Sequence, residues 1–189
     1  MGVHVAVFDA CVLYPAPLRD FLMELSTKDL FRAKWTEQIH DEWIRNVLSN
    51  RPDLTREQLD RTRRIMNQAV PDSLIEGYEW LIDDLALPDP DDRHVLAAAI
   101  HGQANVIVTF NLRDFPPAAL DPHGIEALHP DDFVFSQFDL SMSAVCSAAK
   151  THRARLKKPP KSVDEYLETL ARQELAETVQ RLRKFADLI

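Results

Sequence analysis

The chain has few cysteines and glycines and no long apolar run. Its 189 residues include two cysteines and four glycines. Cys11 and Cys146 form no Cys-x-x-Cys pair, so neither a disulfide framework nor a thiolate zinc site is indicated. No apolar run approaches the length of a membrane span, and the first residues lack a basic leader followed by an apolar stretch. We therefore expect a soluble, cytoplasmic protein in which both cysteines are buried; a soft metal-ligand role for Cys11, close to Asp9, is the lesser alternative.

Basic residues are scarce in the middle of the chain. The formal net charge is −8, and residues 71–140 carry 14 carboxylates but only two basic side chains. Residues 150–161, in contrast, contain six bases and no acid. A second basic face is predicted on one helix, at Arg56, Arg63 and Arg64. A solvated helix face is the simpler interpretation of those arginines, but an acidic centre between basic flanks is also what a metal-dependent nuclease needs.

The apolar pattern predicts an α/β fold with a mainly parallel central sheet flanked by helices. Short apolar runs typical of buried strands occur at residues 3–8, 105–110 and 125–128. The segments predicted to be helices between them are residues 18–25, 37–48, 55–70 and 90–101. Residues 73–85 fit either a helix or a short strand followed by a helix. Strands that alternate with helices imply right-handed crossovers and parallel pairing.

The character of the chain changes near residue 141. We therefore divide it into a main domain at residues 1–140 and a helical extension at residues 141–189. In the extension, the segment Ser162-Val-Asp-Glu165 is a capping box that predicts one long final helix. The apolar stripe of that helix must be covered by the main domain or by another chain. The basic linker before it supplies candidate contacts for phosphate groups at Lys157, Lys158 and Lys161.

Four acidic residues lie at the end or edge of apolar elements. Asp9 directly follows the first predicted strand, and Asp114 lies in the loop after the second. Ligands of an open parallel sheet bind outside the carboxyl ends of its strands, where these two residues are expected. Glu42 borders the apolar stripe of its helix, and Asp92 shares a helix face with apolar residues, so both should lean inward. Because clustered carboxylates repel one another unless a cation neutralises them, the four predict a site for a hard divalent cation.

Each acid also has an ordinary structural interpretation. Asp92 could simply satisfy a helix N-terminus, and Glu42 could be a surface acid. Asp9 and Asp114 could stabilise turns. The four together are harder to explain in this way than any one of them.

Other polar residues lie beside the predicted site. Thr109 and Asn111 point the same way by the two-residue period of a strand, and so add two polar groups at the same edge. Asp91 is a neighbouring candidate that the helical spacing favours less than Asp92. The histidines are not spaced as a zinc motif, and we expect His40, His94 and His101 to be core or surface residues.

Two segments give the chain a specific resemblance: Asp-Arg-His-Val-Leu-Ala-Ala-Ala at residues 92–99 and Val-Thr-Phe-Asn-Leu-Arg-Asp-Phe-Pro at residues 108–116. Over about residues 3–135 the chain resembles the PIN-domain ribonucleases, and among them the VapC-type toxins of bacterial toxin–antitoxin pairs. The resemblance implies a PIN-like fold, Mg²⁺ or Mn²⁺ as cofactor, RNA as substrate, a small antitoxin as partner and a homodimer. The family's four acids correspond to Asp9, Glu42, Asp92 and Asp114, with Thr109 and Asn111 beside the last of them.

We expect Asp9 and Asp92 to supply the main ligands, with Glu42 and Asp114 completing the site or orienting the attacking water. A housekeeping RNA-processing PIN nuclease and a catalytically silent module that binds RNA or a partner are alternatives. A haloacid-dehalogenase-like phosphatase also begins with a strand and an aspartate. It needs a second aspartate two residues later, where this chain has Cys11.

Overall fold

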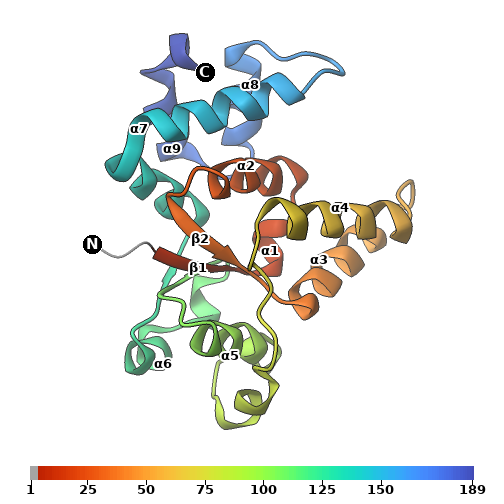
Figure 1. Ribbon diagram of the computed structural model, residues 1–189, viewed down its shortest axis with the longest axis vertical. Helices are drawn as coiled ribbons and strands as arrows, with labels where there is room; N and C mark the ends of the chain where they lie inside the picture. The colour runs from red at the N-terminus through yellow and green to blue at the C-terminus, as the bar shows by residue number, and fades with distance from the viewer. Residues whose placement is uncertain (1–3) are drawn as a thin grey trace.

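A four-stranded, entirely parallel sheet lies at the centre of the protein (Figure 1). The computed structural model describes residues 4–189, so Val3 of the first predicted strand lies outside the described residues. In chain order the strands are β1 (His4–Phe8), β2 (Phe31–Lys34), β3 (Val106–Val108) and β4 (Glu126–Leu128). They are arranged in the order β2-β1-β3-β4. The predicted α/β class, parallel sheet and flanking helices are confirmed.

Strand β2 is the one strand that the apolar pattern does not predict. Its four residues alternate, with Phe31 and Ala33 buried and Arg32 exposed. Two apolar residues in a four-residue strand are too few for a periodicity signal. The strand exists because it pairs with β1, in the register Ala6 opposite Ala33.

Four helices of the main domain lie close to their predicted positions: α2 (Ala16–Ser26), α3 (Glu37–Asn50), α4 (Arg56–Ala69) and α5 (Arg93–His101). Two four-residue helices, α1 (Ala10–Leu13) and α6 (Pro117–Leu120), were not predicted. Thr36 and Thr55 cap α3 and α4, each accepting a hydrogen bond from the backbone three residues on. The 3₁₀ turns are η1 (Glu79–Asp84), η2 (Pro90–Asp92), η3 (Leu112–Asp114), η4 (Asp121–His123) and η5 (Ala186–Leu188).

Two predicted segments differ in detail from the structure. Asp89 caps a helical start as expected, but its first turn is the 3₁₀ turn η2, and α5 begins only after Asp92. In residues 73–85, neither interpretation is fully correct. Leu74 forms an isolated parallel bridge with Trp35, and the helical part is the 3₁₀ turn η1.

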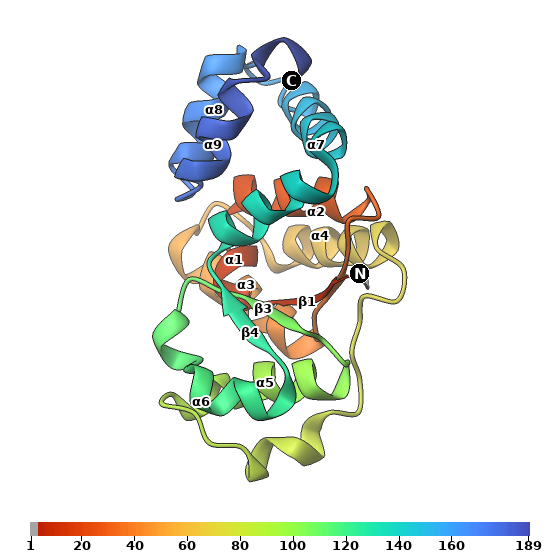
Figure 2. The same ribbon diagram turned by 90° about the vertical axis from the view of Figure 1, so that its left-hand side faces the viewer.

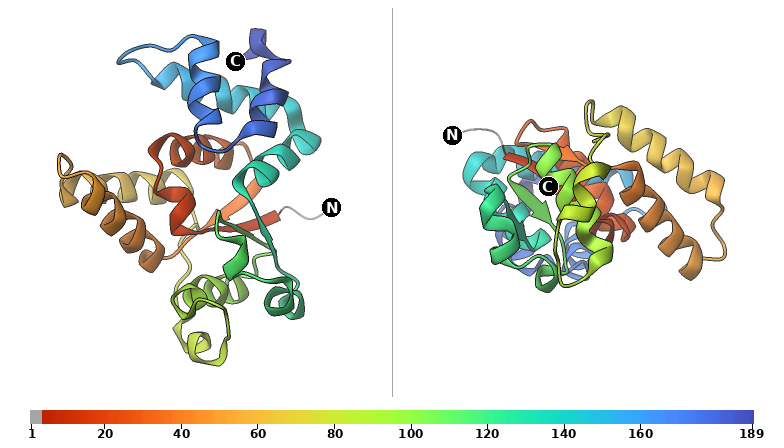
Figure 3. Two further views of the ribbon diagram at one scale, coloured as in Figure 1. Left: turned by 180° about the vertical axis from the view of Figure 1, so that it is seen from behind. Right: turned by 90° about the horizontal axis from the view of Figure 1, so that it is seen from below.

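The helices cover both faces of the sheet. Helices α5 and α6 lie on one side, and α2 with the first part of α7 (Pro130–Arg155) lies on the other (Figure 2). Helices α3 and α4 project together from the rest of the molecule (Figure 3). None of the helices formed by residues 4–189 combines the length and the apolar character needed to cross a membrane.

The C-terminal region is a group of helices that packs on α2. Helix α7 runs through the predicted boundary at residue 141, where Ser141 has extended dihedral angles (φ −161°, ψ 98°) and kinks the helix. The single long final helix that was predicted is wrong. The chain forms α8 (Val163–Ala171) and α9 (Ala176–Arg183), separated by a turn in which Glu174 has φ 62°. The break lets the two helices fold side by side, so that Leu167, Leu170 and Leu182 are all fully buried.

Asp131 connects the first turn of α7 to the start of α9. Its two carboxylate oxygens accept hydrogen bonds from the backbone N–H groups of Glu177 (2.7 Å) and Thr178 (2.9 Å). The residue before α9, Leu175, has no side chain that can cap the helix. Asp131 therefore supplies the missing cap from a residue far away in the sequence, while only 7% exposed.

We predict that Asp131→Ala lowers the free energy of unfolding by about 2 kcal/mol, because two N–H groups at the start of α9, that of Thr178 buried and that of Glu177 partly buried, lose their acceptor. Urea denaturation measures the change. Asp132→Ala is the matched control. It removes the same charge from the same first turn of α7, but Asp132 is exposed. Equal losses in the two variants would contradict the capping role.

Candidate active site

Asp9 is a buried carboxylate held by three hydrogen bonds. It follows β1, caps α1 and is only 4% exposed. One oxygen, Oδ1, accepts from the N–H of Ala10 at 2.6 Å. The other, Oδ2, accepts from Thr109 Oγ1 at 2.7 Å and from Cys11 Sγ at 3.2 Å. Burial raises the pKa of Asp9, the hydrogen bonds from Thr109 and Cys11 oppose that effect, and the charge of Glu42 adds to it.

The sheet register explains why Thr109 meets Asp9. Phe8 lies opposite Val108, and the N–H of Asp9 donates to the carbonyl of Val108 at 3.1 Å. The next residue on each strand is therefore brought to the same edge of the sheet. Thr109 is fully buried, and its hydroxyl also accepts a hydrogen bond from the N–H of Asn111 at 3.0 Å. Thr109 is thus placed beside the acid as the sequence predicted.

Cys11 is more than a buried small hydrophobe. It is partly exposed, donates to Asp9 and accepts a hydrogen bond from the N–H of Phe110 at 3.3 Å. Burial and the charge of Asp9 raise the pKa of the Cys11 thiol to about 12. In the absence of a metal the group is therefore protonated and acts as a hydrogen-bond donor to Asp9.

Asp92 lies within the electrostatic influence of the other predicted acids. Burial, together with the negative charges of Asp9, Asp89, Asp114 and Glu42, raises the pKa of its carboxyl to about 7. The η2 turn that carries it therefore brings it close to acids from three other parts of the chain. Asp91, the neighbouring candidate, is exposed and is not among the charges that shift Asp92.

Glu42 and Asp114 complete the acidic group. Glu42 lies on α3, which packs against α1, and a carboxylate oxygen of Glu42 is 3.4 Å from His94 Nε2. His94 is 3% exposed and follows Asp92 by two residues, so it links the α3 acid to α5. From the sequence we expected His94 to be a core or surface residue. Its place in the Asp-Arg-His segment, two residues after Asp92, was the signal that could have predicted its contact with the acidic group. Asp114 is half-buried in η3.

The side chain of Asn111, unlike that of Thr109, makes no hydrogen bond to Asp9. It is exposed, and its contact with the site runs through its backbone N–H. Its side chain is thus free to reach a ligand at the rim rather than to support Asp9.

The four acids are neighbours rather than a closed set of ligands. Among residues 4–189, no three His, Cys, Asp or Glu side chains are close enough together to form a ready-made metal centre. The donor set nevertheless fits a hard cation, because it consists of carboxylate oxygens whose mutual repulsion raises the pKa of Asp92. Mg²⁺ usually keeps several water ligands, so it needs only one or two of these carboxylates directly.

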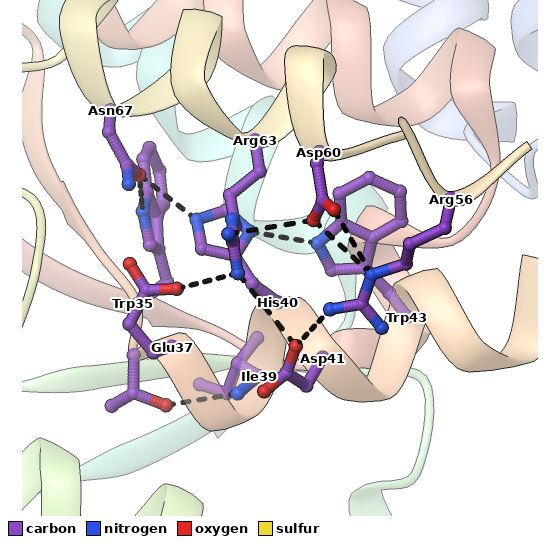
Figure 4. Close-up of polar contacts among 11 residues, drawn as sticks. Trp35, Glu37, Ile39, His40, Asp41, Trp43, Arg56, Asp60, Arg63 and Asn67 are labelled. Carbon is purple, nitrogen blue, oxygen red and sulfur yellow. Dashed lines mark hydrogen bonds and ion pairs between the residues drawn. The ribbon is translucent and has the colours of Figure 1, made fainter. Parts of the chain in front are cut away.

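The predicted basic face of α4 is partly neutralised. Figure 4 shows Arg56 and Arg63 between acids of α3 and α4. Arg56 lies 2.7 Å from Asp41 and 3.2 Å from Asp60. Arg63 lies 3.1 Å from Glu37 and 3.5 Å from Asp60. Both guanidinium groups are therefore engaged within the α3–α4 pair, although exposed ion pairs of this kind exchange easily with a competing phosphate.

Beneath these ion pairs, a largely buried network of hydrogen bonds connects α4 to α3 (Figure 4). Trp43 donates to His40 Nδ1 at 3.0 Å, and His40 Nε2 is 3.0 Å from Asn67 Oδ1. The same Asn67 oxygen accepts from the Trp35 indole at 2.8 Å. Burial lowers the pKa of His40 to about 4, so the ring is neutral near pH 7. His40 is therefore a core histidine, and its network fixes the helix that carries Glu42.

The remaining basic candidates are more accessible. Arg64, Lys157 and Lys158 are exposed. Lys161 is half-buried, and its Nζ donates to Thr169 Oγ1 at 2.5 Å. In Figure 1 the loop between α7 and α8 lies on the far side of α2 from α5. RNA that touches both the acids and this linker would have to run along the face between them.

Comparison with known proteins finds two family matches and one similar protein. The profile of the family described as PIN domain matches residues 5–113, and that described as VapC50 C-terminal domain matches residues 130–184. A protein of Mycobacterium tuberculosis (strain ATCC 25618 / H37Rv), named "Putative ribonuclease VapC50", is 47% identical over 75 residues. This match covers 38% of the chain and 44% of the relative, less than half of either. No solved structure matches the chain significantly.

Proposed function

The chain belongs to the PIN-domain family, and we propose that it is a metal-dependent endoribonuclease that acts as the toxin of a toxin–antitoxin pair. The observation that carries the proposal is that acids from four separate parts of the chain come together: burial first, and then the charges of Asp9, Asp114 and Glu42, raise the pKa of Asp92. Such repulsion between carboxylates is retained where a cation relieves it. The named relative supports RNA as the substrate.

We propose that Asp9 and Asp92 hold Mg²⁺ or Mn²⁺, with Asp114 and Glu42 completing the site. When bound, a divalent cation lowers the pKa of a water molecule and polarises the scissile phosphate. Glu42 and Asp114 would accept hydrogen bonds from the attacking water and orient it. Thr109 and the α1 backbone keep the Asp9 carboxylate fixed, so that little reorganisation is needed during the reaction.

The direct test is cleavage of RNA by the purified protein. We expect cleavage with Mn²⁺ or Mg²⁺ and none with an excess of EDTA. Cleavage that persists in EDTA would overturn the metal dependence. No cleavage of any RNA with either metal, by a folded protein, would instead favour a silent binding module.

The proposed partners are the RNA substrate, a small antitoxin protein and a second copy of the chain, acting in the cytoplasm where RNA is available. We predict that the protein sediments as a homodimer at micromolar concentration, because a two-fold pair would place two acidic sites beside shared basic surfaces. Analytical ultracentrifugation measures this, and a monomer without its partner would contradict it. Inhibition of growth on expression, relieved by the product of a small adjacent gene, would distinguish a toxin from a housekeeping nuclease.

We predict that neutralising Lys157, Lys158 and Lys161 weakens RNA binding at low salt. The salt dependence of the affinity should flatten by up to about three phosphate contacts. Binding of Mn²⁺ should be unchanged. Affinity for RNA is measured in metal-free buffer at several salt concentrations. A variant neutralising the exposed Arg172, Arg183 and Lys184 is the matched control.

An unchanged affinity and salt slope in the linker variant, together with lost antitoxin binding, would assign the linker to partner docking. The basic α7–α8 loop would then play no part in holding RNA.

A further inference from the structure

We propose that Cys11 is a positioning residue, whose thiol holds the Asp9 carboxylate in the orientation that a cation requires. The proposal rests on the proposed function and adds to it a residue outside the four acids. Cys11 lies in α1, two residues after Asp9. Its sulfur is within hydrogen-bonding distance of three groups: Asp9 Oδ2, Thr109 Oγ1 and the N–H of Phe110.

The thiol joins two separate parts of the chain. Asp9 and Cys11 belong to the end of β1 and the start of α1, whereas Thr109 and Phe110 follow β3. The backbone already connects these segments once, through the N–H of Asp9 and the carbonyl of Val108. Cys11 adds a side-chain bridge just beyond the last ladder bond, at the level of the carboxylate. It therefore ties α1 to the segment that leads to Asp114.

The hydrogen bonds determine which part of Asp9 remains available. A carboxylate has about four lone-pair directions. Three are used, one on Oδ1 by Ala10 and two on Oδ2 by Thr109 and Cys11. One direction on Oδ1 is left, so Asp9 can bind a cation through a single oxygen. If Cys11 did not donate, Oδ2 would keep a free lone pair and the carboxylate would be held by Thr109 alone on that side.

The chemistry of position 11 follows from these contacts. The side chain must donate to a carboxylate and accept from a backbone N–H at once, which a thiol or a hydroxyl can do. A methyl group can do neither, so alanine would leave the Phe110 N–H without its acceptor. Serine keeps both roles, although its shorter C–O bond lengthens the contacts. Serine should therefore rescue most of what alanine loses.

The test compares Cys11→Ala, Cys11→Ser and wild type in three measurements. Mn²⁺ affinity, measured by calorimetry, should fall on the order of tenfold in Cys11→Ala and recover in Cys11→Ser, as for groups that orient metal ligands. The kcat for RNA cleavage should follow the same order, with KM for RNA unchanged. Amide hydrogen exchange of Phe110 in the metal-free protein should accelerate in Cys11→Ala only.

Cys146→Ala is the matched control, because it removes the protein's other thiol, which is buried in α7 outside the acidic group. It should change none of the three measurements. Wild-type Mn²⁺ affinity in Cys11→Ala, while Asp9→Asn loses metal, would overturn the role of Cys11 and leave the proposed function intact. If the wild-type protein binds no metal and Asp9→Asn behaves identically, the proposed function itself fails, and the positioning role with it.

Discussion

Asp9→Asn should abolish RNA cleavage by the protein and leave it folded. The substitution removes the ligand charge from the most buried of the four acids, and we expect the rate to fall on the order of a hundredfold or more. Asparagine keeps the shape of the side chain, and its oxygen can still accept from Thr109 and Cys11. Its amide would face the Ala10 N–H, which costs about 1 kcal/mol as a lost helix cap. The charge that burial penalises is removed at the same time, so folding should change little.

The measurement is the cleavage rate at saturating Mn²⁺, with the unfolding transition recorded for the same preparation. Asp83→Asn is the matched control. It makes the same change from carboxylate to amide, but at an exposed acid in η1. It should cleave as wild type does. Turnover at the wild-type rate by Asp9→Asn, in a preparation free of contaminating nuclease, would remove the basis for the assignment of the site.

The place of Asp9 and Thr109 could be predicted because it depends on local rules. A buried strand is recognised from a short apolar run, and the carboxyl ends of parallel strands meet at one edge. The position of Asp92 needed only helical spacing. Its environment did not follow from that spacing, because α5 begins one turn later than predicted and the acids around it come from three other segments.

Features that depend on tertiary contacts could not be predicted. Arg56 and Arg63 form a basic stripe on an isolated helix, but α3 brings Asp41 and Glu37 against them. The final apolar stripe gives no signal for the turn at Glu174, which is set by how α8 and α9 pack together. The capping role of Asp131 joins residues 46 and 47 positions apart, beyond any local pattern.

Cys11 shows the same limit within the site. Its spacing from Asp9 predicted that it lies near the acids, and its residue type predicted a small buried hydrophobic residue. Only the pairing of β1 with β3 brings Thr109 and Phe110 to its sulfur. The hydrogen-bonding role of a residue next to a strand end is thus decided by the neighbouring strand.

Asp92→Asn should make the metal-free protein more stable while it abolishes cleavage. The folded state holds the pKa of Asp92 at about 7, well above the ordinary value of an aspartate, because of burial and the surrounding acids. The unfolded chain releases this proton at lower pH, so the carboxyl lowers stability as pH rises from about 4 to 7 and costs most above pH 7. A pKa shift of this size corresponds to a change of about 4 kcal/mol in the free energy of unfolding. We expect about 1 to 2 kcal/mol, because Asp92 is partly exposed and solvent screens its charge.

Urea denaturation in EDTA at pH 8 and pH 5 measures the effect, and the gain of Asp92→Asn over wild type should be clear at pH 8 and smaller at pH 5. Asp91→Asn is the matched control, because Asp91 is the exposed neighbour in η2 and does not contribute to the shift. Adding Mg²⁺ should stabilise wild type, since a ligand that binds only the folded state shifts the equilibrium towards it, and should not stabilise Asp92→Asn. A gain in Asp91→Asn instead would assign the inward acid to position 91. A loss of stability in Asp92→Asn at pH 8 would mean that Asp92 makes a stabilising contact rather than carrying the repulsion that a cation relieves.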